Sequence, residues 1–346
     1  MPVDAAFLTA LPKCEHHLHI EGTLSPVDLF TLAKRNKIDL PTDDPAYASP
    51  TTLAQRYRAF TSLDDFLAYY YRGMAALLHA ADFELLTWSY LQRAHTEGVH
   101  HAEIFFDPQA HLSRGVSLPT VLEGLKAACK RAEAELSMST LLIPCILRHL
   151  PAADGLDVLR SKDFQDAVKN KQFVGIGLDS SENGFPPELF TEIYNEARSL
   201  GLRVTAHAGE EGPAENVIKS LDLLKCERID HGIRSAEDPE LLVRLTREKI
   251  LLTVCPLSNV SLRCVKDVSE LPLRNFLDAG VRFSINSDDP EYLGGYILDS
   301  YKAVQKAFDL STEEWICICQ NAIKGSWCSL QRKEELRAEC EKVRHR

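Results

Sequence analysis

The stretch Lys13-Cys14-Glu15-His16-His17-Leu18-His19-Ile20-Glu21-Gly22 has the pattern of a short strand that ends at a glycine. Side chains on a strand alternate between two faces, so His17 and His19 point the same way. Two imidazoles on one face can bind one metal ion, but a metal site needs further ligands. Because a His-x-His pair also occurs by chance, its interpretation depends on what the rest of the chain supplies.

The size and charge of the chain limit the classes of protein to which it can belong. Its 346 residues correspond to one large or two ordinary domains, and an α/β barrel fits this length as one domain. The formal net charge of −11 argues against duplex nucleic acid or an anionic membrane as the main partner, since both attract basic surfaces. A small polar molecule is compatible with this charge, and no protein partner is indicated.

The cysteines indicate a reducing compartment. None of the ten lies in a Cys-x-x-Cys pair, and most fall inside apolar runs, as Cys145 does. This distribution is typical of buried, reduced thiols. The N-terminus has no secretion signal pattern, and no apolar run reaches membrane-spanning length. We therefore expect a cytoplasmic protein, with a nuclear pool also open.

Short apolar runs alternate with amphipathic segments along most of the chain. Together with the first stretch, the expected strands are 101–106, 141–147, 173–178, 203–207, 228–231, 250–254 and 282–286. Eight strands with helical crossovers predict a (β/α)8 TIM barrel, an α/β fold, formed as a single domain by residues 1–346. Extra helices are expected after the first strand and at the C-terminus. A doubly wound open sheet is less favoured, because no Gly-x-Gly-x-x-Gly motif follows a strand.

Polar residues gather where four of these strands end. His17 and His19 end the first, residues 205–211 the fifth, residues 229–232 the sixth and residues 284–290 the eighth. Each group alone has an ordinary explanation, such as a turn, a helix cap or a solvated pair. In a barrel, however, reactive groups lie at the C-terminal ends of the strands, so all four groups would share one rim. The joint pattern predicts a catalytic metal site.

These residues also carry a family resemblance. The set His17-x-His19, His207-Ala-Gly-Glu210, Asp230-His231-Gly232 and Ser287-Asp288-Asp289-Pro290 resembles the adenosine/adenine deaminases of the amidohydrolase superfamily. The local sequence is most similar to that of the fungal-type adenine deaminases. Examples are Thr205-Ala-His-Ala-Gly-Glu-Glu-Gly-Pro-Ala214, Cys255-Pro-Leu-Ser-Asn259 and Asn321-Ala-Ile-Lys-Gly-Ser-Trp-Cys328. The resemblance covers nearly the whole chain in the right order.

The resemblance implies one zinc ion. Its ligands would be His17, His19, His207 and Asp288. Imidazoles and one carboxylate suit zinc, and a water molecule would complete the coordination. The bridging lysine of two-metal relatives has no counterpart near Ser180-Ser181-Glu182. Manganese, iron or cobalt could also enter such a site.

The resemblance also implies a reaction, the hydrolytic deamination of adenine to hypoxanthine and ammonia in purine salvage. Hydroxide supplied by the metal would attack C6 of the purine. Glu210 would protonate ring N1, His231 would orient or deprotonate the water, and Asp289 would hold the imidazole edge near N7.

The choice between free base and nucleoside rests on two further glutamates. Adenosine deaminases usually have Asp where Glu21 stands, and a small glycine at about Glu182. Free adenine carries an N9–H donor that the nucleoside lacks, and either carboxylate could accept it. A site built to bond an N–H strongly disfavours an analogue without it. Both glutamates are therefore candidate substrate-binding residues, although either could equally be solvated or paired with an arginine.

Three other functions stay open at this point. Adenosine or an N6-substituted adenine could be the substrate of the same chemistry. Another mononuclear amidohydrolase could cleave an amide or ester, but it would not need Glu210 and Asp289. A catalytically silent, metal-stabilised binding protein would be free to lose Glu210 or His231, which this chain retains.

Overall fold

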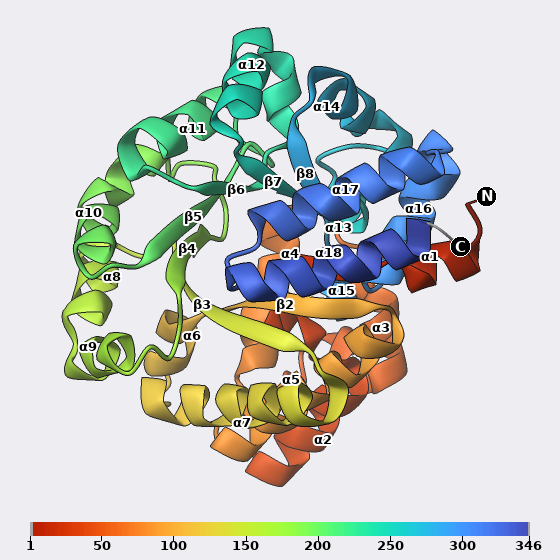
Figure 1. Cartoon of the computed structure of the whole chain (residues 1–346). Coiled ribbons are helices and arrows are strands. Elements are labelled where there is room, and N and C mark those ends of the chain that lie inside the picture. Colours follow the sequence, from red (N-terminus) through yellow and green to blue (C-terminus); the bar gives the residue numbers. More distant parts are fainter. Residues whose placement is uncertain (1–2, 345–346) are drawn as a thin grey trace.

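Eight parallel strands form one sheet in chain order in the computed structural model, which describes residues 3–344. The strands are β1 (Lys13–His19), β2 (Val99–Phe106), β3 (Ser139–Leu147), β4 (Gly175–Asp179), β5 (Arg203–Ala208), β6 (Arg228–His231), β7 (Leu251–Val254) and β8 (Arg282–Ile285). The sheet curls into a barrel with helices around it (Figure 1). The predicted TIM barrel is therefore confirmed.

The barrel closes between its first and last strands just beyond the end of β8. The backbone N–H of Asp288 donates to the carbonyl of His17, and the N–H of His19 donates to the carbonyl of Asp288, both at 3.0 Å. The bonds that close the barrel therefore also fix Asp288 beside the two histidines of β1.

Helices precede, connect and follow the strands. They are α1 (Ala5–Ala10), α2 (Pro26–Asn36), α3 (Pro50–Tyr57), α4 (Leu63–Met74), α5 (Ala80–Thr96), α6 (Pro108–Leu112), α7 (Leu118–Leu136), α8 (Ala152–Arg160), α9 (Lys162–Lys169), α10 (Thr191–Ser199), α11 (Ala214–Lys219), α12 (Pro239–Glu248), α13 (Pro256–Ser261), α14 (Leu273–Ala279), α15 (Pro290–Leu293), α16 (Ile297–Phe308), α17 (Thr312–Gly325) and α18 (Leu330–Arg344). No described helix is long and apolar enough to cross a membrane.

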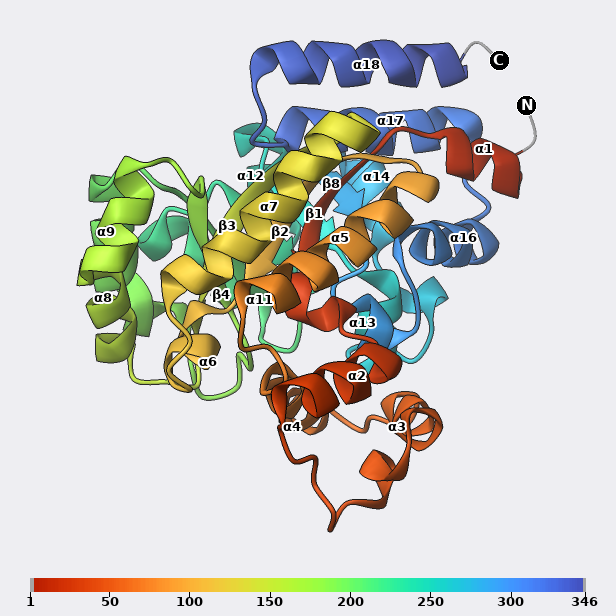
Figure 2. The same cartoon turned by 90° about the horizontal axis from the view of Figure 1, so that it is seen from below.

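The helices outside the repeating pattern cover opposite ends of the barrel. Figures 1 and 2 show α17 and α18 across one end, whereas α2, α3 and α4, which follow β1, lie at the other. The second end is the one toward which the strands run, so α4 is positioned to cover a site at the strand ends. Helix α2 begins as its sequence predicts, because the Ser25 side chain accepts the backbone N–H of Asp28 and Pro26 follows.

Two segments differ from what their sequence suggests. Residues 154–170 form parts of two helices, because Ser161 is extended and its hydroxyl caps α9. Residues 329–346 are rich in charged side chains, which is typical of a solvated segment, but one face of α18 buries Leu336, Cys340 and Val343. The side chain of Arg332 also bonds the backbone carbonyls of His100 and Ser137. Packing against the barrel thus outweighs the polar composition of α18.

Candidate active site

Three histidines and one aspartate meet at the end of the barrel. The ligand atoms of His17, His19, His207 and Asp288 lie within 4.8 Å of one another, and all four residues are buried. His17 Nε2 is 3.1 Å from Asp288 Oδ1, and His19 Nε2 is 3.2 Å from His207 Nε2. The structure therefore brings together residues from β1, β5 and the segment after β8.

Further contacts orient two of the three imidazole rings. His17 Nδ1 lies 2.9 Å from the hydroxyl of Thr253, which donates to Asp230. His19 Nδ1 lies 3.4 Å from Asp179 Oδ2. In these two rings, Nδ1 is engaged from outside the cluster and Nε2 faces its centre, whereas His207 Nδ1 makes no hydrogen bond with a described residue and lies 3.8 Å from Asp230 Oδ2. Metal-binding histidines typically have such a partner on the second nitrogen, which fixes the ring and its tautomer.

The donor set fits a divalent metal ion. His17 Nε2 is buried without a hydrogen-bonding partner among the described residues, and two imine nitrogens face each other at His19 and His207. Burial, followed by the charge of His17, lowers the pKa of His207 well below its usual value. A neutral imidazole is the form that binds a metal. Cys255 also lies near this centre, in a second group with His17, His231 and Asp288, and burial raises the pKa of its thiol well above the usual value.

Glu210 and His231 lie side by side next to the cluster. His231 Nε2 is 3.4 Å from Glu210 Oε2 and 3.8 Å from Asp288 Oδ2. The side-chain amide of Asn259 reaches both, at 3.3 Å from Glu210 Oε1 and 3.2 Å from His231 Nδ1. Burial, followed by the charge of Asp288, raises the pKa of Glu210 well above its usual value. Glu210 is thus suited to carry a proton beside a metal centre at neutral pH.

The backbone adopts left-handed conformations at three strand ends around the site. Ser180 has a φ of 72°, His231 of 61° and Asp288 of 67°. Such angles are uncommon for residues other than glycine and persist where the surroundings hold them. Here the left-handed turns accompany the side chains that face the centre at the ends of β4, β6 and β8.

Asp289 lies against the end of β1. A side chain at Gly22 would place its Cβ 2.0 Å from Asp289 Oδ1 and 2.6 Å from Asp289 Cα, so only glycine allows this approach. Asp289 Oδ1 is buried without a hydrogen-bonding partner among the described residues. Burial, followed by the charge of Asp288, raises the pKa of Asp289 well above its usual value.

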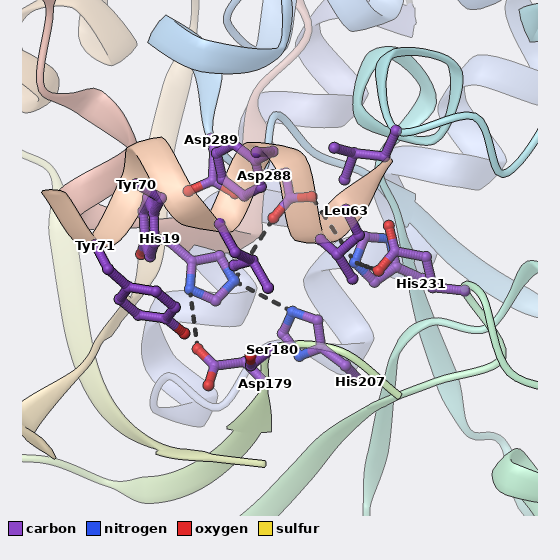
Figure 3. A pocket seen from close by; sticks show the side chains of 14 residues that line it. His19, Leu63, Tyr70, Tyr71, Asp179, Ser180, His207, His231, Asp288 and Asp289 are labelled. Carbon is purple, nitrogen blue, oxygen red and sulfur yellow. Dashed lines mark hydrogen bonds and ion pairs between the residues drawn. The ribbon is translucent and has the colours of Figure 1, made fainter. Parts of the chain in front are cut away.

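A narrow cavity opens beside the cluster. Figure 3 shows Asp289 and Asp179 on opposite sides of the His19 ring, with Tyr70 and Tyr71 of α4 beside them. The residues that line the cavity are His19, Leu63, Phe66, Leu67, Tyr70, Tyr71, Asp179, Ser180, His207, Glu210, His231, Leu262, Asp288 and Asp289. Its walls are therefore aromatic and aliphatic on the α4 side and polar at the strand ends.

Glu182 and Glu21 do not line this cavity. Glu182 accepts hydrogen bonds from the backbone N–H groups of Gly209, Glu210 and Glu211 and from the Asn216 amide. Glu21 Oε1 lies 2.8 Å from His111 Nε2 and accepts the backbone N–H of Asp107. Neither glutamate is solvated or paired with an arginine, contrary to both alternatives raised by the sequence. The structure places both behind the wall, where Glu182 holds the loop that carries Glu210.

Several residues of the site were not identified from the sequence. Asn259 and Ser258, whose hydroxyl donates to Asp288 Oδ2, stand in the Cys255–Asn259 motif directly after β7, but no role was assigned to them. Asp179 is the last residue of β4, and its position at a strand end was the available signal. Tyr70 and Tyr71 lie in an aromatic run of α4 that is also typical of a helix-packing surface.

Comparisons with known proteins identify what the chain as a whole is similar to. A sequence model of the adenosine deaminase family matches residues 12–343. Adenine deaminase from Schizosaccharomyces pombe is 53% identical over 340 residues, which cover 97% of this chain and 92% of that protein. The crystal structure of adenine deaminase from Arthrobacter aurescens matches with a TM-score of 0.91 at 44% identity, covering 97% of this chain and 100% of that chain. An amidohydrolase from Burkholderia ambifaria with bound zinc matches with a TM-score of 0.88 at 26% identity, covering 100% of this chain and 95% of that one.

Proposed function

The chain belongs to the adenosine deaminase family, and we propose that it catalyses the hydrolytic deamination of adenine to hypoxanthine and ammonia. It would thus be a hydrolase of purine salvage that acts on a C–N bond of a cyclic amidine. Relatives named adenine deaminase match nearly the whole chain at about half identity or just below. The observation that carries the proposal is the position of Glu210 and His231 directly beside a buried cluster suited to a metal.

We propose that His17, His19, His207 and Asp288 hold one zinc ion. The support comes from the donor set, the facing nitrogens of His19 and His207 and the zinc in the Burkholderia structure. A zinc ion held there would make a nucleophile available at neutral pH, because zinc lowers the pKa of water to about 7. Two other groups of described residues could hold a metal ion, but one shares His17 and Asp288 with this set and the other shares His19, so neither is an independent site.

The protein side chains would then move the protons. Burial, followed by the charge of His17, lowers the pKa of His231 well below its usual value, so a neutral ring can take a proton from the attacking water. Glu210 donates its proton to N1 as water adds at C6. The proton on His231 leaves with the amino group as ammonia, and the remaining hydroxyl proton returns to Glu210 as C6 becomes a carbonyl. Asp289, which holds a proton, donates to N7.

Replacing His231 with asparagine is expected to lower kcat by about 10²-fold or more while zinc content stays at the wild-type value. Asparagine tolerates the left-handed backbone of this position, so the effect should report the lost imidazole. Steady-state kinetics and metal analysis on the same sample check this. His95→Asn, on the exposed face of α5, serves as the control. Loss of zinc in the variant would make His231 a ligand instead of a proton acceptor.

Replacing Glu182 with glutamine is expected to lower kcat by about 10- to 100-fold, because a small displacement of a catalytic group is that costly. The amide places an N–H donor against backbone N–H groups that now point at a carboxylate, and the loop with Glu210 shifts. The adenine-to-adenosine ratio of kcat/KM should stay unchanged. A change in this ratio would show that Glu182 contributes to substrate binding.

The function itself is tested by incubating the metal-replete protein with adenine, adenosine, N6-methyladenine and AMP separately. The 6-oxopurine product is measured in each reaction, together with the released amine, which is methylamine from N6-methyladenine and ammonia from the other three. We expect turnover of adenine to exceed that of the other three. Preferred turnover of adenosine or of N6-methyladenine would replace the substrate but keep the chemistry, and no 6-oxopurine from any of the four would refute the deaminase assignment.

We also infer that the enzyme works in the reducing environment of the cytoplasm or nucleus. All ten cysteines are free in the structure, and six of them are buried. Thiols kept reduced are typical of these compartments.

A further inference from the structure

Asp179 presents a buried carboxylate to the cavity. It is 3% exposed and it ends β4 on the side of His19 opposite to Asp289 (Figure 3). Its Oδ2 lies 3.4 Å from His19 Nδ1, and its Oδ1 has no hydrogen-bonding partner among the described residues. Among residues 3–344, no lysine or arginine lines the cavity. A buried acceptor without a partner is energetically costly, and a molecule bound in the cavity could supply the missing donor.

The carboxyl group of Asp107 lies behind Asp179 and does not line the cavity. Because Asp107 is acidic, it does not supply a positive charge that would pair with the Asp179 carboxylate. Because each carboxylate oxygen has two lone pairs, a proton shared with Asp107 leaves Asp179 able to accept from the cavity side. The His19 contact and the Asp107 contact therefore do not exhaust the hydrogen-bonding capacity of Asp179.

The chemistry of the purine decides which donor reaches Asp179. N1 and N7 flank C6 on its two sides, and Glu210 and Asp289 are the polar groups that would meet them. The remaining polar edge of the ring, which carries N9, then faces the third polar wall of the cavity. That wall is formed by Asp179 and Ser180 at the end of β4. A neutral free base carries an N–H at this edge, whereas a nucleoside carries carbon.

We propose, on the basis of the function proposed above, that Asp179 accepts the imidazole N–H of free adenine and thereby selects the free base over N9-substituted purines. A substituent on N9 removes the donor and also meets Tyr70 and Tyr71, which close this end of the cavity. Sites built to bond an N–H reject an analogue that lacks it by about 10⁴- to 10⁵-fold. Asp179 thus takes the specificity role for which the sequence offered Glu21 and Glu182.

The test compares adenine with 9-methyladenine in the wild-type protein and in Asp179→Asn. The variant keeps an oxygen for His19 but turns an amide donor toward the substrate N–H. We expect kcat/KM for adenine to fall by about 10²-fold, with kcat/KM for 9-methyladenine changed only a few-fold and zinc content unchanged. Asp107→Asn is the same substitution at a residue that does not line the cavity. It should preserve the ratio of kcat/KM between adenine and 9-methyladenine. Parallel loss with both substrates, or unchanged adenine turnover, would overturn the proposal and leave Asp179 as a positioning residue for His19.

A binding measurement separates this inference from the proposed reaction. Calorimetry with hypoxanthine and 9-methylhypoxanthine reports the same contact without turnover. The wild-type protein should prefer hypoxanthine, and Asp179→Asn should lose most of that preference. If the wild-type protein did not turn over adenine, the proposed reaction would be refuted. The binding comparison would still show whether Asp179 contacts the imidazole N–H. If Asp179→Asn kept the full preference for hypoxanthine over 9-methylhypoxanthine, the proposed contact would be refuted.

Discussion

Replacing Asp288 with asparagine is expected to empty the metal site and to lower kcat for adenine by at least about 10³-fold, because the metal supplies the nucleophile at neutral pH. The carboxylate lies 3.1 Å from His17 Nε2 and is the only charged member of the candidate ligand set. An amide oxygen is a weaker ligand for zinc than a carboxylate. Metal analysis of the purified variant and initial rates with adenine measure the two effects.

The backbone at this position decides which variant is informative. Asp288 has a φ of 67°, a conformation that asparagine tolerates and alanine does not, so Asp288→Ala would mix strain with ligand loss. Asp309, at the end of α16, also has a positive φ, 45°, but is exposed. Asp309→Asn is therefore the matched control and should retain zinc and turnover. Full zinc in Asp288→Asn would remove Asp288 from the ligands.

Replacing Glu210 with glutamine should reduce kcat by about 10²- to 10⁴-fold with zinc retained, as expected for a general acid–base residue. The carboxyl group is buried beside His231, and the raised pKa lets it hold the proton that N1 must receive. Glutamine preserves the size and the contact with Asn259 but cannot give up a proton to the ring. Single-turnover rates with adenine separate this loss from slower product release.

Glu211 provides the control for that experiment. It is the next residue in the same loop, is half-buried, and does not line the cavity. Glu211→Gln should therefore stay within a few-fold of wild type, consistent with a substitution outside the reacting groups. Near-normal turnover in Glu210→Gln at full zinc would show that another group protonates N1.

The barrel and the residues of the cluster were accessible from the sequence for a physical reason. Alternation along a strand places His17 and His19 on one face, and parallel strands bring their C-terminal ends to one rim. His207, Glu210, His231 and Asp288 all stand at such ends, so topology alone predicts that they meet. The family resemblance supplied the assignment of roles, and the family itself is confirmed.

The residues in the outer part of the site could not be predicted from strand alternation and topology. Glu182 stands three residues after Asp179, the last residue of β4, but its partners are backbone N–H groups of a loop that begins 27 residues later. Whether a residue at a rim faces the cavity or the wall depends on one local turn, here the left-handed Ser180. The cover provided by Tyr70 and Tyr71 depends on how α4 packs across the barrel end. These are tertiary effects that periodicity does not encode.

The most direct test of the central claim is a zinc titration of the metal-free protein with adenine as substrate, in which ammonia release is measured at each addition. If His17, His19, His207 and Asp288 hold one catalytic ion, the rate should be negligible without metal, rise linearly and level off at one equivalent of zinc per chain. Full activity without metal, or a rate that does not respond to zinc, would contradict the account.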